Sequence, residues 1–332
     1  MDTPLSPAVP THTDVLFLLL PDSLILDWAG PAEALRMANV AMVQRGEAAP
    51  FRLRFVGPQP ETVTSVGATV AGLEPLPRTF AHPTWVVLLG QPGACFTVDG
   101  AAAQGALRWL RNLTLRPGAL ELVTICAGAV LAAHAGLLNG RRATTHHQHL
   151  DELQAAAPGC QVVSNRVFVE DAPVYSSAGV TTGVDLVLHR IGTACGPAVA
   201  ARVAQTMVVA MRRGPQDPEL SPFLAYRNHL HPALHRVQDA ISHAPAQDWD
   251  LDGMAAIAHA SPRHLTRLFV EHAQVAPLAY LRQIRLAVAQ SALRSGRNVT
   301  QAAEMAGFSS DTQLRRAWKQ FGAVGTPSQA GG

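Results

Sequence analysis

The strongest constraint on the fold is a change of pattern partway along the 332-residue chain. Up to about residue 195, short apolar runs alternate with stretches of helical composition. Beyond about residue 228, the β-branched runs disappear and the pattern is helical throughout. Apolar strands without polar alternation, separated by helices, are typical of a mainly parallel sheet covered on both faces. The sequence therefore predicts an α/β domain, with ligands at the carboxyl ends of its strands, followed by an all-α domain.

A segment rich in Pro, Gly and charge separates the two patterns. It reads MRRGPQDPELSPF, residues 211–223, and follows an Ala- and Val-rich helix predicted at about 197–211. Such a composition is typical of a linker. We therefore expect a first domain at 12–212, a linker at 213–228 and a second domain at 229–324.

The two parts of the chain differ in charge. Residues 221–332 hold 11 Lys and Arg against 7 Asp and Glu, whereas residues 1–220 hold 15 against 17. The basic second part is the candidate for contact with an anionic partner, although a solvated basic face explains the difference about as well.

The apolar runs and the cysteines both indicate an ordinary cytoplasmic protein. The longest uniformly apolar run, VLFLLL at 15–20, is too short to span a membrane, and no basic residue precedes it as in a signal peptide. We interpret it as a buried strand. The cysteines stand more than thirty residues apart, so free thiols are expected at Cys95, Cys126, Cys160 and Cys195.

One pattern occurs twice in the second domain, at 251–269 and 299–318. Each copy begins with a short Ala-rich helix, turns at AHAS or AGFS, and enters a second helix that carries a leucine and, four residues later, an aromatic residue. Ser261, before a proline, is a typical N-cap, and Ser309 or Ser310 can cap the second copy. The pattern indicates two helix-turn-helix units.

An amphipathic helix joins the two copies. The segment PLAYLRQIRLAVAQSALRSG carries an apolar stripe along roughly nineteen residues, a length of about 28 Å. The stripe consists of Leu278, Leu281, Ile284, Val288 and Ala292. A helix of this length can hold two recognition helices about one DNA turn apart, near 34 Å.

This arrangement resembles the DNA-binding domain of the AraC family of transcription regulators, in which one helix joins two helix-turn-helix motifs. The resemblance covers about residues 230–324 through SPRHLTRLF, APLAYLRQIRLAVAQ and AEMAGFSS. The apolar positions expected to face the core are Leu265, Leu268, Phe269, Leu314 and Trp318. The side chains expected to face DNA are Arg263, His264, Thr266, Arg267, Asp311, Thr312, Arg315 and Arg316.

The resemblance implies a narrower set of base-facing positions, namely Arg263, Thr266, Arg267, Thr312 and Arg316. An arginine there can form two hydrogen bonds to a guanine edge, although a phosphate contact or a solvated charge fits each arginine alone about as well. Two features depart from the family. His259 stands where a turn glycine is expected, and the tail FGAVGTPSQAGG lacks the usual aromatic and basic end. Either departure could loosen one motif.

In the first domain, one apolar run ends in a cysteine. ELVTIC followed by AGAVLAAHAG predicts a strand, a tight turn and a helix, with Cys126 at the turn. A thiol at such an elbow faces a helix N-terminus, whose partial positive charge lowers the thiol pKa. A lone cysteine that ends a strand is otherwise a buried, inert residue.

The position of Cys126 resembles that of the nucleophile in the DJ-1/PfpI and class I glutamine amidotransferase superfamily. The order of the two domains is similar to that of the GlxA-type subgroup of AraC regulators, which carry this flavodoxin-like domain at the N-terminus. The match spans about residues 12–212 through DWAGPAEAL, CAGAVLAAHAGLLNGRRATTHH and SSAGVTTGVDLVLH. It implies a sensor domain that binds a small molecule.

The resemblance also implies a pocket around the thiol. It places His146 near Cys126, Glu33 close enough to bond the thiol, and an anion site at the amides of Cys126, Ala127 and residues 90–93. The predicted ligand-binding residues are Glu33, Cys126, Ala127, His146 and Asp185. Asp185 either borders the pocket or serves as a negative charge at a helix N-terminus.

Turnover is not expected in this pocket. No clear acid follows His146, and Ala127 stands where relatives often carry a hydroxyl residue, so Cys126, His146 and Glu33 are interpreted as vestigial. The alternative is a Cys126-dependent hydrolase, hydratase or amidase with a DNA-binding appendage. A third possibility is an architectural DNA binder whose first domain only dimerises.

Neither a metal nor a cofactor is expected. His146, His147 and His149 form a cluster, but neighbours on a strand point to opposite faces and no cysteine or carboxylate follows in motif spacing. The expected partners are double-stranded DNA, a small-molecule effector, and a second copy of the chain bound through the N-terminal domain. Family analogy alone suggests a nitrogenous effector, such as an amino acid or a quaternary amine. No contact with a membrane is expected.

Overall fold

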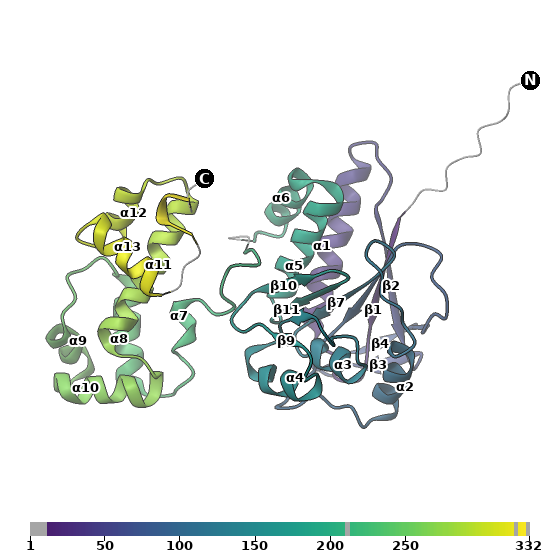
Figure 1. The fold of residues 1–332 in the computed structure, drawn as a ribbon, viewed down its shortest axis with the longest axis horizontal. Helices are drawn as coiled ribbons and strands as arrows, with labels where there is room; N and C mark the ends of the chain where they lie inside the picture. The colour runs from purple at the N-terminus through teal and green to yellow at the C-terminus, as the bar shows by residue number, and fades with distance from the viewer. Residues whose placement is uncertain (1–11, 210–212, 322–324, 330–332) are drawn as a thin grey trace, which may run out of the picture. The chain divides into compact units, whose positions relative to one another are not determined.

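A computed structural model describes residues 12–209, 213–321 and 325–329. The chain divides into two compact units, Met1–Glu219 and Leu220–Gly332, and this division falls inside the linker predicted at 213–228 (Figure 1). The predicted domain ends at residues 212 and 324 lie outside the described residues.

Seven strands form the main sheet of the first unit, in the order β10-β11-β7-β6-β1-β2-β5. Every neighbouring pair is parallel except β10 and β11. The central order β2-β1-β6-β7-β11 is the flavodoxin-like order, which confirms the predicted fold class. The strands are β1 (Thr13–Leu18), β2 (Phe51–Gly57), β5 (Glu74–Pro75), β6 (Thr84–Leu88), β7 (Leu120–Ile125), β10 (Phe168–Asp171) and β11 (Val174–Ser177).

Helices cover both faces of this sheet. All residues of β6 and β7 are buried, and successive strand residues point to opposite faces, so neither face meets water. One group of helices that pack together contains α1 (Ile25–Val43), α5 (Thr182–Cys195) and α6 (Pro197–Thr206). The other contains α2 (Ala101–Leu110), α3 (Gly128–His134) and α4 (Leu150–Ala156). The helix predicted at 197–211 thus ends earlier, at Thr206.

Shorter elements complete the first unit. Two small sheets pair β3 (Glu61–Val63) with β4 (Thr69–Ala71) and β8 (Arg142–Ala143) with β9 (Gln161–Val162). One 3₁₀ turn, η1, spans His147–His149. Across the described parts of the chain, no helix combines the length and apolar character needed to cross a bilayer.

The second unit is entirely helical in its described residues. Its helices are α7 (Pro222–Ala225), α8 (Pro232–His243), α9 (Leu251–Ala258), α10 (Pro262–Leu268), α11 (Pro277–Arg294), α12 (Val299–Met305) and α13 (Asp311–Gln320). A π-helical turn, η2 (Phe269–Ala273), continues α10, and a 3₁₀ turn, η3 (Pro327–Gln329), lies near the end of the chain.

Helix α11 is shared by two separate hydrophobic cores. Leu281 and Ile284 pack with α8, α9 and α10, whereas Ala289 and Ala292 pack with α12 and α13. The predicted joining helix is therefore confirmed, and its 18 residues span about 27 Å. One position of the predicted stripe is wrong. Leu278 is 40% exposed and borders a groove, whereas Pro277 and Tyr280 in the same turn of α11 are buried.

Both turns of the helix-turn-helix units adopt the left-handed conformation. Gly307 has a φ of 79° and His259 a φ of 52°, so histidine occupies the place expected for glycine without preventing the turn. The amide of His259 still donates to carbonyls of α9, which closes that helix. At the start of the recognition helices, Ser261 accepts from the His264 amide and Ser310 from the Gln313 amide, as predicted for N-caps.

Candidate DNA-binding surface and sensor site

The first recognition helix, α10, presents a polar face to solvent. Its apolar positions Leu265, Leu268 and Phe269 are buried, while Arg263, His264 and Arg267 are exposed. Thr266 is half-buried, and its hydroxyl donates to the Pro262 carbonyl at 2.9 Å. Arg267 lies 3.0 Å from Nδ1 of His264. The two side chains therefore form one polar surface along the helix.

The second recognition helix, α13, is similar. Leu314 and Trp318 are buried, whereas Thr312, Arg315 and Arg316 are exposed. Asp311 is half-buried, and its carboxylate accepts from the Thr300 hydroxyl of α12 at 3.1 Å. This bond gives Asp311 a structural role at the start of the helix. The predicted division into core-facing and solvent-facing positions matches both helices, except that Thr266 and Asp311 are half-buried.

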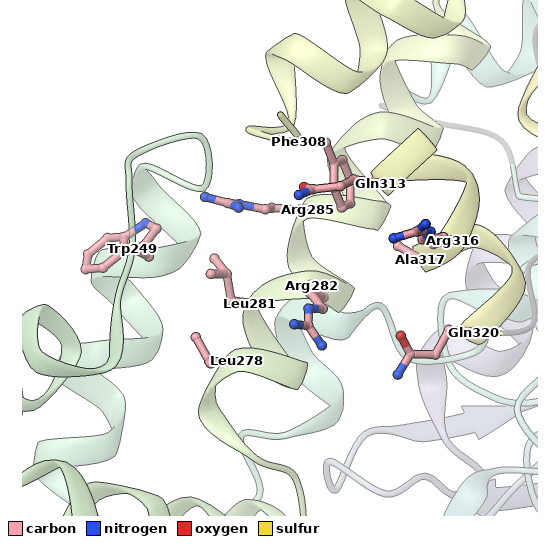
Figure 2. A pocket seen from close by; sticks show the side chains of 10 residues that line it. All are labelled: Trp249, Leu278, Leu281, Arg282, Arg285, Phe308, Gln313, Arg316, Ala317 and Gln320. Carbon is pink, nitrogen blue, oxygen red and sulfur yellow. The ribbon is translucent and has the colours of Figure 1, made fainter. Parts of the chain in front are cut away.

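A groove lies between α11 and α13; Arg316 in its lining was predicted to face DNA, whereas Arg282 and Arg285 were not singled out (Figure 2). It has a volume of about 430 Å³ and contains three guanidinium groups, those of Arg282, Arg285 and Arg316. Arg285 binds the carbonyls of Pro245 and Gln247 at 2.9 and 2.8 Å, which fixes it on the loop before α9. The i, i+3 spacing of the two arginines on α11 was the available sequence signal, since it places them on one helix face.

The first unit contains the predicted strand, turn and helix around Cys126. The residue follows β7 with a φ of 56°, a left-handed conformation that is strained for any side chain, and α3 begins two residues later. Close packing holds this elbow in place. A Cβ added to Gly128 would lie 2.4 Å from the Leu88 carbonyl oxygen, and one added to Gly90 would lie 2.8 Å from the Cys126 Cβ.

The carboxylate beside the thiol is Asp27 and not Glu33. Glu33 is on the exposed side of α1 and pairs with Arg36 at 2.7 Å, so the prediction that it bonds the thiol is wrong. Asp27, six residues earlier on a different face of the same helix, is fully buried, and its Oδ2 accepts from the Gly90 amide at 2.8 Å. The sequence DWAGPAEAL offers two acids, and only the packing of α1 decides which one points inward.

The thiol itself is held in its neutral form. Burial and the negative charge of Asp27 raise the pKa of Cys126 to about 12, against a smaller lowering by the amides of Ala127 and Val180. The predicted lowering by the helix N-terminus is therefore wrong, because desolvation and a nearby carboxylate outweigh it. Burial also raises the pKa of Asp27 to about 6.

Two of the amides predicted to bind an anion are already occupied. The Cys126 amide donates to the Ser177 carbonyl at 3.2 Å, and the Gly90 amide donates to Asp27. In contrast, the Asp27 Oδ1 is buried without a hydrogen-bond partner among the described residues. The site therefore offers a free acceptor, the Asp27 Oδ1, while two of its donors are already used. This favours a ligand that carries N–H groups.

His146 lies beside Cys126, as predicted. A Cβ added to Gly179 would lie 2.9 Å from His146 Cδ2 and 3.2 Å from the Cys126 Sγ, so both side chains border the same glycine. Burial and the neighbouring His147 lower the pKa of His146. The prediction that the histidines alternate on a strand is wrong, because the chain turns there into η1.

Comparisons with known proteins agree with both domains. Residues 254–329 match a helix-turn-helix domain family and residues 101–192 match the DJ-1/PfpI family. The chain is 30% identical over 308 residues to the HTH-type transcriptional regulator GlxA of Rhizobium meliloti, covering 92% of this chain and 91% of that protein. The chain belongs to the GlxA-type transcriptional regulators.

One further relative supports this placement, and one solved structure supports the fold of the first unit. The HTH-type transcriptional regulator CdhR of Pseudomonas aeruginosa is 31% identical over 322 residues, covering 95% of this chain and 90% of that protein. A THiJ/PfpI family protein from Pseudomonas syringae, 18% identical, superposes with a TM-score of 0.51 over 78% of this chain and 97% of its own length. At that identity the second comparison shows the fold alone.

In this GlxA-type regulator, Asp185 binds the chain segment that follows α6. It lies in the first turn of α5, where the helix dipole favours a negative charge, and it is buried. Its oxygens accept from the Arg213 amide at 3.1 Å and from the Arg213 guanidinium at 2.9 and 2.6 Å. Both carboxylate oxygens are therefore used within the protein.

Proposed function

We propose that this regulator reads specific DNA sequences with α10 and α13, and that a small molecule bound near Cys126 changes its affinity for DNA. Two observations support this proposal together. The second unit presents two solvent-facing recognition helices on separate cores that one helix joins. The first unit contains a buried site in which the Asp27 Oδ1 has no hydrogen-bond partner among the described residues. The enzyme alternative is less well supported, because the Cys126 thiol has a pKa of about 12 and the adjacent Ala127 offers no side-chain donor.

The DNA-reading residues are proposed to be the exposed polar side chains of the two recognition helices. Arg263 and Arg267 on α10, and Arg316 on α13, can each bond a guanine edge or a phosphate. The exposed Thr312 and the half-buried Thr266 lie on the same helices and complete the base-facing set. Since α11 spans about 27 Å, the two helices are suited to sites about one DNA turn apart, near 34 Å.

Selection from random duplex DNA tests this part of the proposal. The full chain should enrich one motif with two recognition elements about ten base pairs apart, and should bind it more tightly than a scrambled duplex at physiological salt. Binding that falls steeply with salt and shows no preferred sequence would contradict it, since phosphate contacts alone behave in that way.

The effector is proposed to bind between Asp27, Cys126 and His146, at the carboxyl ends of the strands. The buried Oδ1 of Asp27 has no partner among the described residues, so an N–H group or a cationic nitrogen would satisfy it. This chemistry is compatible with the nitrogenous metabolites suggested by family analogy.

The connection to DNA binding is proposed to run through residues 213–219. Val180 contributes an amide to the environment of Cys126 and Asp27, and its neighbour Thr181 accepts from Arg213 at 3.2 Å. At the other end of the segment, Glu219 accepts from the amide of His147, next to His146. A ligand that moves either contact would reposition the start of the second unit, provided that it binds the two arrangements with different affinity.

A thermal-shift screen of amino acids, quaternary amines and other metabolites tests the sensor site. Wild type, Cys126→Ala and Asp27→Asn are compared in parallel, and a compound at a hundred times its dissociation constant should stabilise wild type by about 2.7 kcal/mol. Compounds that stabilise wild type but not Asp27→Asn support the site. If wild type consumes a compound and Cys126→Ala only binds it, the enzyme alternative is correct. If no compound shifts any variant, the first unit is architectural.

A homodimer formed through the first unit is also proposed, by resemblance to the family. Light scattering of the full chain should give about twice the chain mass of 35.2 kDa. A mass equal to one chain at micromolar concentration would contradict a stable dimer.

A further inference from the structure

Two histidines and a glutamate meet beside the proposed effector site, with which they share only His146. One ligand atom each from His146, His147 and Glu219 lies within 4.8 Å of the others. Nδ1 of His147 is 2.9 Å from Oε1 of Glu219, and the same oxygen accepts from the His147 amide at 3.1 Å. The rings of the two histidines have their centroids 4.1 Å apart.

The local backbone explains why consecutive histidines share one side. His146 is the residue before η1, and its ring accepts from the Gln148 amide, which turns it toward the same side as His147. Because the chain enters a 3₁₀ turn directly after His146, the two side chains are not the alternating neighbours of a strand. The strand alternation used against a metal site in the sequence therefore does not apply.

The donor set suits a borderline divalent metal ion. Two imidazole nitrogens and one carboxylate oxygen are common ligands of Zn²⁺, which binds them at about 2.0–2.2 Å in a tetrahedral arrangement with one position open. Ligand atoms at such distances lie about 3.3 Å apart, so separations between 2.9 and 4.8 Å require only small side-chain movements. Glu219 has a side chain 6% exposed and His147 one 39% exposed, so the carboxylate is shielded while one edge remains open for the ion.

We propose that His146, His147 and Glu219 form a binding site for a divalent transition-metal ion, for which Zn²⁺ is the best match. Glu219 is the last residue of the first unit, and His146 borders Cys126. Metal binding would therefore hold Glu219, at the end of the first unit, against the residues that surround Cys126. The site shares His146 with the proposed effector site, but its test changes His147 and Glu219 whereas the effector test changes Asp27 and Cys126, so the two proposals can fail separately.

A second histidine cluster provides the necessary comparison. His229, His231, His235 and His272 in the second unit have ring centroids 4.5–6.3 Å apart. Within the described residues, however, only the group around Glu219 brings three ligand atoms within 4.8 Å of one another. The second cluster therefore serves as a control for adventitious binding by imidazoles.

The test measures Zn²⁺ bound to the untagged full chain, without DNA. After treatment with chelator, loading with Zn²⁺ and desalting, elemental analysis should find about one Zn²⁺ per wild-type chain. Competition with a chromophoric chelator should show that His147→Ala and Glu219→Gln each weaken binding by at least about tenfold, while His272→Ala matches wild type. Circular dichroism confirms that each variant is folded. If Glu219→Gln does not fold, His147→Ala alone decides the test, because the His147 side chain is partly exposed and its removal should leave the fold intact.

Two results would overturn the proposal. The first is that wild type retains no stoichiometric Zn²⁺, or that His147→Ala and Glu219→Gln both retain it as well as wild type does. The second is loss of the ion in His272→Ala alone, which would assign it to the second cluster. Neither result bears on DNA recognition, which is measured separately.

Discussion

The reactivity of Cys126 gives the sharpest prediction for the first unit. Burial and the Asp27 charge raise its pKa from 9.0 to about 12, so the thiolate fraction near neutral pH falls about a thousandfold. A thiolate of higher pKa is intrinsically more nucleophilic, with a Brønsted slope of about 0.4–0.5, which restores a factor of about 16–32 over three pKa units. Alkylation should therefore be about 30- to 60-fold slower than for an ordinary thiol, before any steric protection.

The assay follows alkylation of Cys126 by iodoacetamide at pH 7.4, with peptide mass spectrometry to separate the cysteines. The reference is the same residue in the urea-unfolded chain, and the exposed Cys95 reports on reagent activity. Asp27→Asn removes the charge but not the burial, so its Cys126 should react faster than that of wild type and still more slowly than in the unfolded chain. If native Cys126 reacts faster than the unfolded residue, the thiol is activated, and the argument from burial and charge is refuted.

Three further predictions concern backbone geometry and pH. Gly128→Ala should lower the free energy of unfolding, measured in urea, by about 2–3 kcal/mol, because the new Cβ would lie 2.4 Å from the Leu88 carbonyl oxygen. The control is Gly100→Ala, which has open space around the new Cβ and should lower the free energy of unfolding by less than about 1 kcal/mol. Equal losses would contradict the steric argument. His259→Gly should stabilise the second unit by about 0.5–1 kcal/mol, because glycine adopts the left-handed conformation without strain. Gly307→Ala should destabilise the same unit, since the new Cβ would lie 2.5 Å from the Ala246 Cα. A loss of stability in His259→Gly would show that the histidine is not strained. The pKa of Asp27 is raised from 3.8 to about 6 by folding, so the native state holds this proton more tightly and loses up to about 3 kcal/mol of stability as the pH rises from about 4 through 6. The unfolding free energy of Asp27→Asn relative to wild type should therefore increase by about 2 kcal/mol between pH 4.5 and 8, and a pH-independent difference would count against it.

The sequence was most informative where periodicity determines structure. The strand–helix alternation predicted the parallel sheet, and the repeated leucine and aromatic spacing predicted that Leu265, Leu314 and Trp318 are buried. Leu278 fits the same stripe, yet it is exposed, because it borders the groove beside α13 while Tyr280 of the same turn packs into the core. Periodicity assigns a face to a residue but does not show where the partner surface ends.

The site was less predictable, since it depends on contacts between distant segments. The choice between Asp27 and Glu33 is made by the packing of α1 against the loop at Gly90, which lies 63 residues away from Asp27. The position of Glu219 beside His147 joins residues 72 apart. The elbow itself was recognisable, because a strand, a cysteine and a small-residue helix are adjacent in sequence.

The most direct test of the central claim is the affinity of the full chain for its selected DNA site, measured for arginine variants at one salt concentration. Arg267→Ala and Arg316→Ala should each weaken specific binding by about 5- to 150-fold, the equivalent of 1–3 kcal/mol. Arg297→Ala removes the same charge from the turn between α11 and α12, outside both recognition helices, and should have a much smaller effect. If all three variants weaken binding equally, charge alone accounts for it and the two helices do not read sequence.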